Sequence, residues 1–132
     1  MAMSDISLEY LAGLMDGEGC ITIRRAAQPR GRSPQHQLAV RISLVYRPTI
    51  AALGVQFGGS VHSYSIGLPR RRSHVWVITG EAAAALLSRL YPLLREKKEQ
   101  AWLAMEFMAQ RTTHAKVTPT PEEFALRDGF YL

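Results

Sequence analysis

The chain has 132 residues and a formal net charge of +5, with thirteen arginines among its sixteen basic residues. This length matches one domain with its own hydrophobic core, so we expect residues 1–132 to form a single domain. The single cysteine, Cys20, excludes an internal disulfide and favours a reducing compartment. The sequence shows no signal-peptide pattern and no apolar run of membrane-spanning length, so we expect an intracellular protein, cytoplasmic, nucleoid-associated or organellar.

The chain begins with a pattern typical of a helix. Ser7 or Asp5 is suited to cap its start, and apolar residues follow at helical spacing as far as Met15. Gly13 and Gly17 are four residues apart and therefore lie on the same side of this helix. Each glycine costs about 1 kcal/mol of helix stability relative to alanine. Two of them at this spacing predict that another backbone approaches the helix closely.

Two acidic residues, Asp16 and Glu18, fall at the C-terminal end of this helix. Carboxylates are unfavourable there, because that end already carries partial negative charge. A divalent cation would remove the conflict, and backbone carbonyls at the helix end would add the oxygen ligands that a hard cation prefers. The alternative interpretation is an ordinary glycine stop with two solvated acids.

After this helix the pattern changes to period two. Ile21 and Ile23 form the apolar face of a first strand, and a loop rich in Pro, Gly, Arg and Ser follows over residues 25–35. A second strand is predicted over residues 37–46. The residues of its apolar face are Leu38, Val40, Ile42 and Leu44. Pro48 suits the first turn of a helix over residues 48–57, which Gly58 and Gly59 end.

The second half of the chain continues with two more strands and then helices. Strands over residues 61–66 and 74–79 form a hairpin joined by a basic loop, residues 68–72. A helix follows over residues 81–90, and Pro92 breaks it. We predict a longer helix over residues 93–110, a loop over residues 112–121 and a short last helix over residues 121–127.

The nine residues at the end of the first helix carry a resemblance to a known family. They are Leu11, Ala12, Gly13, Leu14, Met15, Asp16, Gly17, Glu18 and Gly19. Six of the nine positions match the LAGLIDADG motif that names a family of homing endonucleases, while Met15, Gly17 and Glu18 replace Ile, Ala and Asp. The segments 36–38, 92–94 and 97–101 are also similar to the single-motif members of this family. The resemblance extends to about residue 110.

The resemblance implies an α+β fold with an α-β-β-α-β-β-α core. In this LAGLIDADG homing-endonuclease fold, a four-stranded antiparallel sheet forms a saddle with helices on one face. It also implies a site-specific, metal-dependent endonuclease that cuts double-stranded DNA at a long pseudo-palindromic site and leaves short 3′ overhangs. The alternative is a catalytically weak relative, either a maturase that binds intron RNA or a DNA-binding regulator.

The motif occurs once, so the resemblance implies a homodimer in which two motif helices pack together across a twofold axis. The residues expected at this interface are Leu11, Ala12, Gly13, Met15 and Asp16. Asp16 also has a structural interpretation, in which its carboxylate bonds backbone groups near the helix end.

The resemblance further implies the site residues. Glu18 would bind the catalytic metal, Mg²⁺ or Mn²⁺, with Ca²⁺ as a non-catalytic substitute, and Gly17 would add its backbone carbonyl. Lys97 matches a basic residue near the active centre, although a lysine on a helix is often only solvated. Tyr46 stands where the family commonly has a glutamine, unless the register differs by one and Arg47 takes that place. Its ring has two interpretations, a hydroxyl that holds a catalytic water or a core ring with an exposed tip.

The resemblance also implies that the strands form a DNA-binding surface, and alternation along them gives its residues. The residues of its polar face are Thr22, Arg24, Gln37, Arg41, Ser43, His62 and Tyr64. These residue types read base edges in a major groove, which accepts a two-stranded ribbon. The loop arginines suited to phosphate contacts are Arg30, Arg32, Arg70, Arg71 and Arg72. The face of the strand over residues 74–79 stays open, and the alternative is a solvated polar face without a ligand.

Overall fold

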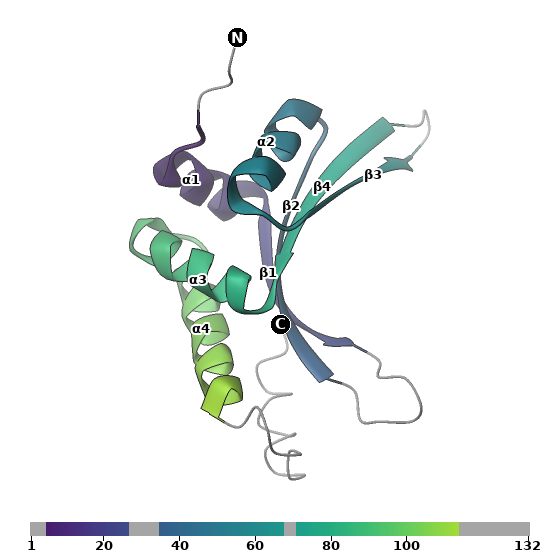
Figure 1. The fold of residues 1–132 in the computed structure, drawn as a ribbon. Helices are drawn as coiled ribbons and strands as arrows, with labels where there is room; N and C mark the ends of the chain where they lie inside the picture. The colour runs from purple at the N-terminus through teal and green to yellow at the C-terminus, as the bar shows by residue number, and fades with distance from the viewer. Residues whose placement is uncertain (1–4, 27–34, 68–70, 114–132) are drawn as a thin grey trace.

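The computed structural model describes residues 5–26, 35–67 and 71–113 (Figure 1). Its elements in chain order are α1 (Leu8–Glu18), β1 (Gly19–Ala26), β2 (Gln35–Leu44), α2 (Arg47–Phe57), β3 (Ser60–Ile66), β4 (Arg71–Thr79), α3 (Gly80–Leu90), the 3₁₀ turn η2 (Tyr91–Leu93) and α4 (Lys98–Thr113). This order confirms the predicted core. Arg30, Arg32, Arg70 and the predicted helix over residues 121–127 lie outside the described residues.

The four strands form one antiparallel sheet in the order β1-β2-β4-β3. Figure 1 shows the four helices on one side of this sheet, while both ends of the sheet curve away from them. The opposite side is therefore concave and carries no helix of the described chain. We call it the concave surface. The predicted saddle-shaped sheet with helices on one face is confirmed.

The hydrophobic core lies between the sheet and the helices. Alternate strand residues point into it, and α3 and α4 contribute their small and apolar faces. The fully buried strand and helix residues at its centre include Ile23, Leu38, Val40, Ile42, Ile50, Leu53, Leu87, Leu90, Ala101 and Ala104. Burial of each large apolar side chain stabilises the fold by roughly 1.5–3 kcal/mol, and this term holds the helices onto the sheet.

Trp76 in β4 settles the face that the sequence left open. Its side chain is fully buried on the helix side, where its ring lies 6.4 Å from the ring of Phe57, centroid to centroid. The indole Nε1–H donates to the carbonyl oxygen of Gly58 at 2.7 Å. Gly58 ends α2 with a φ of 81°, a conformation that favours glycine. The even-numbered residues of β4 therefore face the helices, and the odd-numbered ones face the concave surface.

Several predicted boundaries were wrong. The loop predicted over residues 25–35 is shorter, because β1 extends to Ala26 and β2 begins at Gln35, and β2 ends at Leu44 rather than at residue 46. Arg71 and Arg72 belong to β4, where they pair with Ile66 and Ser65, rather than to the loop before it. The last described helix begins at Lys98 instead of residue 93, because Pro92 lies in a 3₁₀ turn and the chain is extended at Leu94. The side chain of Leu94 is buried in the core, so this short connection is fixed in place.

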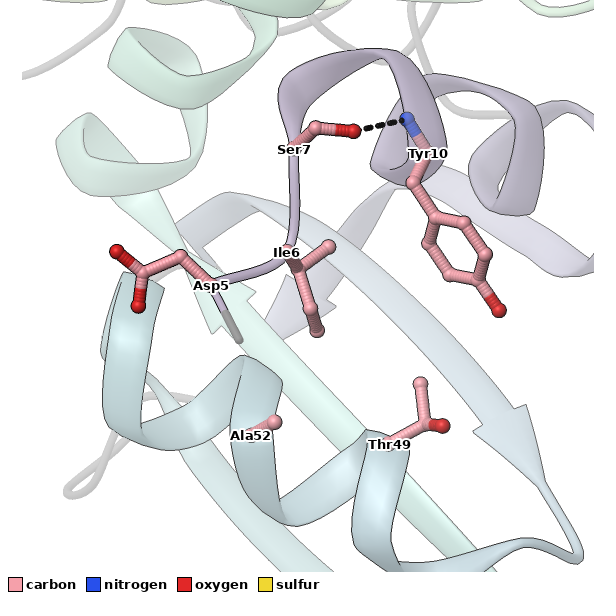
Figure 2. Close-up of a pocket in the computed structure, with 6 residues that line it drawn as sticks. All are labelled: Asp5, Ile6, Ser7, Tyr10, Thr49 and Ala52. Atoms are coloured by element: carbon pink, nitrogen blue, oxygen red, sulfur yellow. Dashed lines mark hydrogen bonds between the residues drawn. The ribbon is translucent and has the colours of Figure 1, made fainter. Parts of the chain in front are cut away.

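Ser7, and not Asp5, caps α1. The Ser7 hydroxyl accepts a hydrogen bond from the Tyr10 backbone N–H at 3.0 Å, as Figure 2 shows. The backbone N–H of the preceding residue, Ile6, donates to the side-chain oxygen of Gln56 in α2 at 2.7 Å. The side-chain Nε2 of Gln56 donates in return to the Ile6 carbonyl oxygen at 2.8 Å. A hollow of about 270 Å³ lies between this segment and Thr49 and Ala52 of α2 (Figure 2). The hollow is in the helix layer, apart from the concave surface.

Candidate functional site

The motif helix α1 continues into strand β1 without a loop. Glu18 is the last helical residue and is exposed, and Gly19 begins β1 opposite Ile42. Gly19 has an extended conformation, and its N–H donates to the carbonyl oxygen of Met15. A Cβ at Gly19 would lie 2.6 Å from that oxygen and 2.8 Å from the Met15 Cα. Glycine is therefore required by space at this junction, which carries Glu18 to the edge of the sheet.

Asp16 joins the end of α1 to the segment before α4. Its carboxylate accepts the backbone N–H of Arg95 at 2.8 Å and that of Lys97 at 3.0 Å, one on each oxygen. These donors offset the unfavourable position of a carboxylate at a helix C-terminus. The structural interpretation of Asp16 is confirmed, and the backbone that it bonds lies about eighty residues later in the chain.

Lys97 is held against the same helix end. Its Nζ donates to the backbone carbonyl oxygen of Asp16 at 3.0 Å, and its side chain is half-buried. The interpretation of Lys97 as only solvated is therefore wrong. Its neighbour Lys98 differs, because it is exposed and its Nζ lies 4.9 Å above the centre of the Tyr91 ring. The structure thus places one of the two adjacent lysines beside the motif.

Tyr46 follows the end of β2 and occupies the N-cap position of α2. Because Gly19 pairs with Ile42, the chain after Ile42 continues past the start of β1, toward the end of the sheet where α1 finishes. The Tyr46 side chain is 67% exposed. The interpretation of Tyr46 as a core ring is therefore wrong, and its hydroxyl is accessible to solvent. Arg47 is the first residue of α2 and is also exposed.

The motif helix has two different faces. Leu11, Ala12 and Met15 are buried in the core of their own domain, so our assignment of these side chains to the dimer interface needs correction. A helix of one domain must bury its apolar side before it presents another side to a partner. Gly13 and Gly17 lie on the exposed side, and a Cβ at either position would meet no atom within 4 Å.

The predicted DNA-binding residues of the strands lie together on the concave surface. Residues directly opposite one another in an antiparallel pair share a face of the sheet. The pairs on this surface are Thr22 with Ala39, Arg24 with Gln37, Arg41 with Val77, Ser43 and His62 with Val75, and Tyr64 with Ser73. Arg71 joins them by alternation, whereas Arg72 belongs to the opposite side of β4 and is a less favourable candidate.

Tyr64 interacts with three other residues of this surface. Side-chain hydrogen bonds from Ser73 and then Ser43, with the charge of Arg41, hold the pKa of the Tyr64 hydroxyl below its ordinary value of 10.0. Tyr64 thus reaches from the edge strand β3 across β4 to β2. Val75, whose cross-strand partners are Ser43 and His62, is only 6% exposed, although it faces the concave side.

No protein-family model matches the chain, and no curated protein sequence matches it significantly. Solved structures do match it. The homing endonuclease I-CvuI, in complex with its DNA target in the presence of 2 mM Ca, superposes with a TM-score of 0.74 and 18% identity, over 91% of this chain and 74% of that chain. The homing endonuclease I-TnaI matches with the same score and identity, over 96% and 86%.

A longer protein matches as well. The LAGLIDADG homing endonuclease I-LtrWI, bound to its target DNA, superposes with a TM-score of 0.73 and 16% identity, over 98% of this chain but 44% of that chain. This chain has the LAGLIDADG homing-endonuclease fold. The predicted fold is therefore confirmed.

Within the LAGLIDADG fold, the motif end offers oxygen ligands for a metal. The exposed Glu18 carboxylate and the Gly17 carbonyl are hard donors of the kind that Mg²⁺ prefers. Among the described residues, no three His, Cys, Asp or Glu side chains form a metal-binding group. A cation bound there would need further oxygen ligands, and phosphate oxygens and water are the kinds that Mg²⁺ usually takes.

Several features of this LAGLIDADG surface were not predicted. Ser73, Val75 and Val77 belong to the concave surface, and the pairing of β4 with β2 decides their direction. Period two alone does not separate the faces of a strand whose central residues are all apolar. Within the described ranges, no helix is both long and apolar enough to cross a membrane.

Proposed function

We propose that this chain is a site-specific, divalent-metal-dependent endonuclease that cuts double-stranded DNA as a homodimer. The observation that carries the proposal is the geometry of the motif end. An exposed carboxylate, Glu18, and a held ammonium, Lys97, stand at the end of a helix that leads directly into the concave surface. Phosphodiester hydrolysis requires a metal ligand and neutralisation of phosphate charge, and these two groups are suited to supply them.

The concave surface supports DNA as the substrate. It carries Arg24 and Arg41, together with amide, hydroxyl and imidazole groups, on a two-layer scaffold that keeps them in register. Arg24 and Arg41 lie on neighbouring strands, β1 and β2, and a major groove accepts a two-stranded ribbon. Arginines contribute forked contacts to phosphates and guanine edges. I-CvuI and I-LtrWI, which share the fold, were solved with DNA targets.

The metal-binding role falls to Glu18 and the Gly17 carbonyl. Mg²⁺ or Mn²⁺ would supply Lewis-acid stabilisation of the phosphate and would lower the pKa of an attacking water. The residues of the chain do the remaining work. Lys97 is suited to stabilise negative charge on the phosphate, and the exposed Tyr46 hydroxyl is suited to orient water. Asp16 positions Lys97 rather than contacting substrate: its carboxylate accepts the Lys97 backbone N–H, and its carbonyl oxygen accepts Lys97 Nζ.

The homodimer follows from the single motif and from the shape of α1. One chain contributes one Glu18, whereas two strands of DNA require two cuts. This chain also covers only 44% of the longer I-LtrWI. The exposed side of α1, with Gly13 and Gly17, allows a second backbone to approach closely. We therefore place the partner helix on this side, and the target becomes a long, nearly palindromic duplex with one half-site for each subunit.

Incubation of the protein with a randomised, partly palindromic duplex library and Mg²⁺, followed by sequencing of the DNA ends, tests this proposal. We expect cut duplexes with short 3′ overhangs, and no cuts with EDTA. Sedimentation at micromolar protein concentration should show a dimer without DNA. Specific enrichment of bound duplex without any cut would instead favour a DNA-binding regulator.

A further inference from the structure

Two side chains of the concave surface are bonded to each other. Arg24 in β1 and Gln37 in β2 are direct partners in the antiparallel ladder. Arg24 donates from Nε at 3.1 Å and from Nη2 at 2.9 Å, and both bonds end on Gln37 Oε1. A guanidinium contains only N–H donors, so the amide must turn its oxygen toward it. The chemistry of the pair therefore fixes the orientation of the Gln37 amide.

This bonding determines what the pair presents to a ligand. A guanidinium has five N–H donors, and the two bonds to Gln37 use two of them. Three donors remain at the outer fork of Arg24, on Nη1 and Nη2. Two more remain on Gln37 Nε2, whereas both lone pairs of Oε1 are engaged. The pair thus offers donors and a positive charge, and no acceptor.

Only one base matches this pattern fully. In the major groove, guanine presents two acceptors, N7 and O6, whereas adenine presents one acceptor and one donor. Cytosine presents a donor, and thymine presents one acceptor beside a methyl group. A free glutamine reads adenine by accepting from N6 and donating to N7. In Gln37 the acceptor needed for N6 is already occupied by Arg24.

We propose that Arg24 and Gln37 act as one donor-only reading unit that selects a guanine in each half-site. This inference rests on the proposed function, because it requires that the concave surface lies in a major groove. Arg24 is five residues beyond Gly19 along β1, a distance of about 17 Å in a strand. The guanine therefore lies in the outer part of the half-site, and the twofold symmetry repeats it once in the other half.

The test is a binding selection on randomised, partly palindromic duplexes with Ca²⁺, for the wild type and three variants. The wild type should enrich guanine over adenine about five-fold or more at one symmetric outer position. Arg24→Leu frees Gln37 Oε1, so the preferred base at that position should change to adenine. Gln37→Leu leaves the arginine fork in place and should retain guanine. Arg25→Leu is the matched control, because it removes an equal charge from the opposite side of β1 and should leave the base preference unchanged.

The outcomes separate the two proposals. A wild type that enriches no sequence overturns the proposed function, and the reading unit with it. A specific site without an outer guanine overturns the reading unit alone. The reading unit is also overturned if Arg24→Leu keeps guanine, or if Gln37→Leu loses it. Thermal melts identify a variant that fails to fold, and Arg24→Val, with a β-branched side chain suited to a strand, then replaces Arg24→Leu.

Discussion

Replacement of Asp16 tests whether this residue holds the end of α1 against the segment before α4. Asp16→Ala removes two hydrogen bonds, at 2.8 Å from Arg95 N and at 3.0 Å from Lys97 N. Hydrogen bonds to charged groups contribute about 1.5–3 kcal/mol each, and the exposed bond to Arg95 belongs at or below the low end. We therefore expect the free energy of unfolding to fall by about 2–4 kcal/mol. In a domain of this size, this loss lowers Tm by roughly 10 °C.

Glu18→Gln is the matched control for Asp16→Ala. It changes a carboxylate two residues later that is exposed, and surface changes of this kind usually alter stability by less than about 0.5 kcal/mol. Denaturant unfolding at one fixed protein concentration measures both variants, because a dimer unfolds with concentration-dependent stability. Hydrogen exchange should show faster exchange of the Arg95 and Lys97 amides in Asp16→Ala. Equal stability of Asp16→Ala and wild type, with both amides still protected, would refute the reasoning.

Three further variants probe the fold and the interface. Gly19→Ala should destabilise the protein by about 2–3 kcal/mol in denaturant unfolding, because its Cβ would lie 2.6 Å from the Met15 carbonyl oxygen; a loss below about 0.5 kcal/mol would contradict this. The double change Gly13→Ala and Gly17→Ala should raise helix stability by about 1 kcal/mol per site and yet weaken the dimer in sedimentation, and an unchanged dimer would show that the interface lies elsewhere. Trp76→Phe should cost about 2–3 kcal/mol because it leaves the carbonyl at the end of α2 without its donor, and a neutral effect in the same assay would argue against that bond.

The sequence predicted the order of the elements and most of the strand faces, because hydrophobic periodicity reports burial directly. It also predicted that Gly58 ends α2. The structure gives the reason, because Gly58 has a positive φ, which favours glycine. The predicted start of α4 was wrong because the burial of Leu94 and the hydrogen bonds accepted by Asp16 hold residues 94–97 outside the helix. Contacts between residues so distant in the chain leave no local pattern.

In the candidate site, too, the sequence predicted the residue types but not the contacts that depend on the folded chain. The motif located Glu18, yet it did not show that Leu11 and Met15 point into their own core. A nine-residue match gives the residue types but not the side of the helix that each one occupies. Likewise, Arg24 and Gln37 were both candidates from alternation, whereas their mutual hydrogen bonds depend on a register that only the folded sheet defines.

The measurement that tests the central claim most directly compares wild type and Glu18→Gln on one duplex recovered from the cleavage library. Binding is measured with Ca²⁺ and cutting with Mg²⁺. We predict equal affinity for the duplex within a few-fold, cuts with 3′ overhangs by the wild type, and no cuts by Glu18→Gln. If the Glu18→Gln variant cuts the duplex as fast as the wild type, that result would contradict the assignment of this carboxylate to the active site.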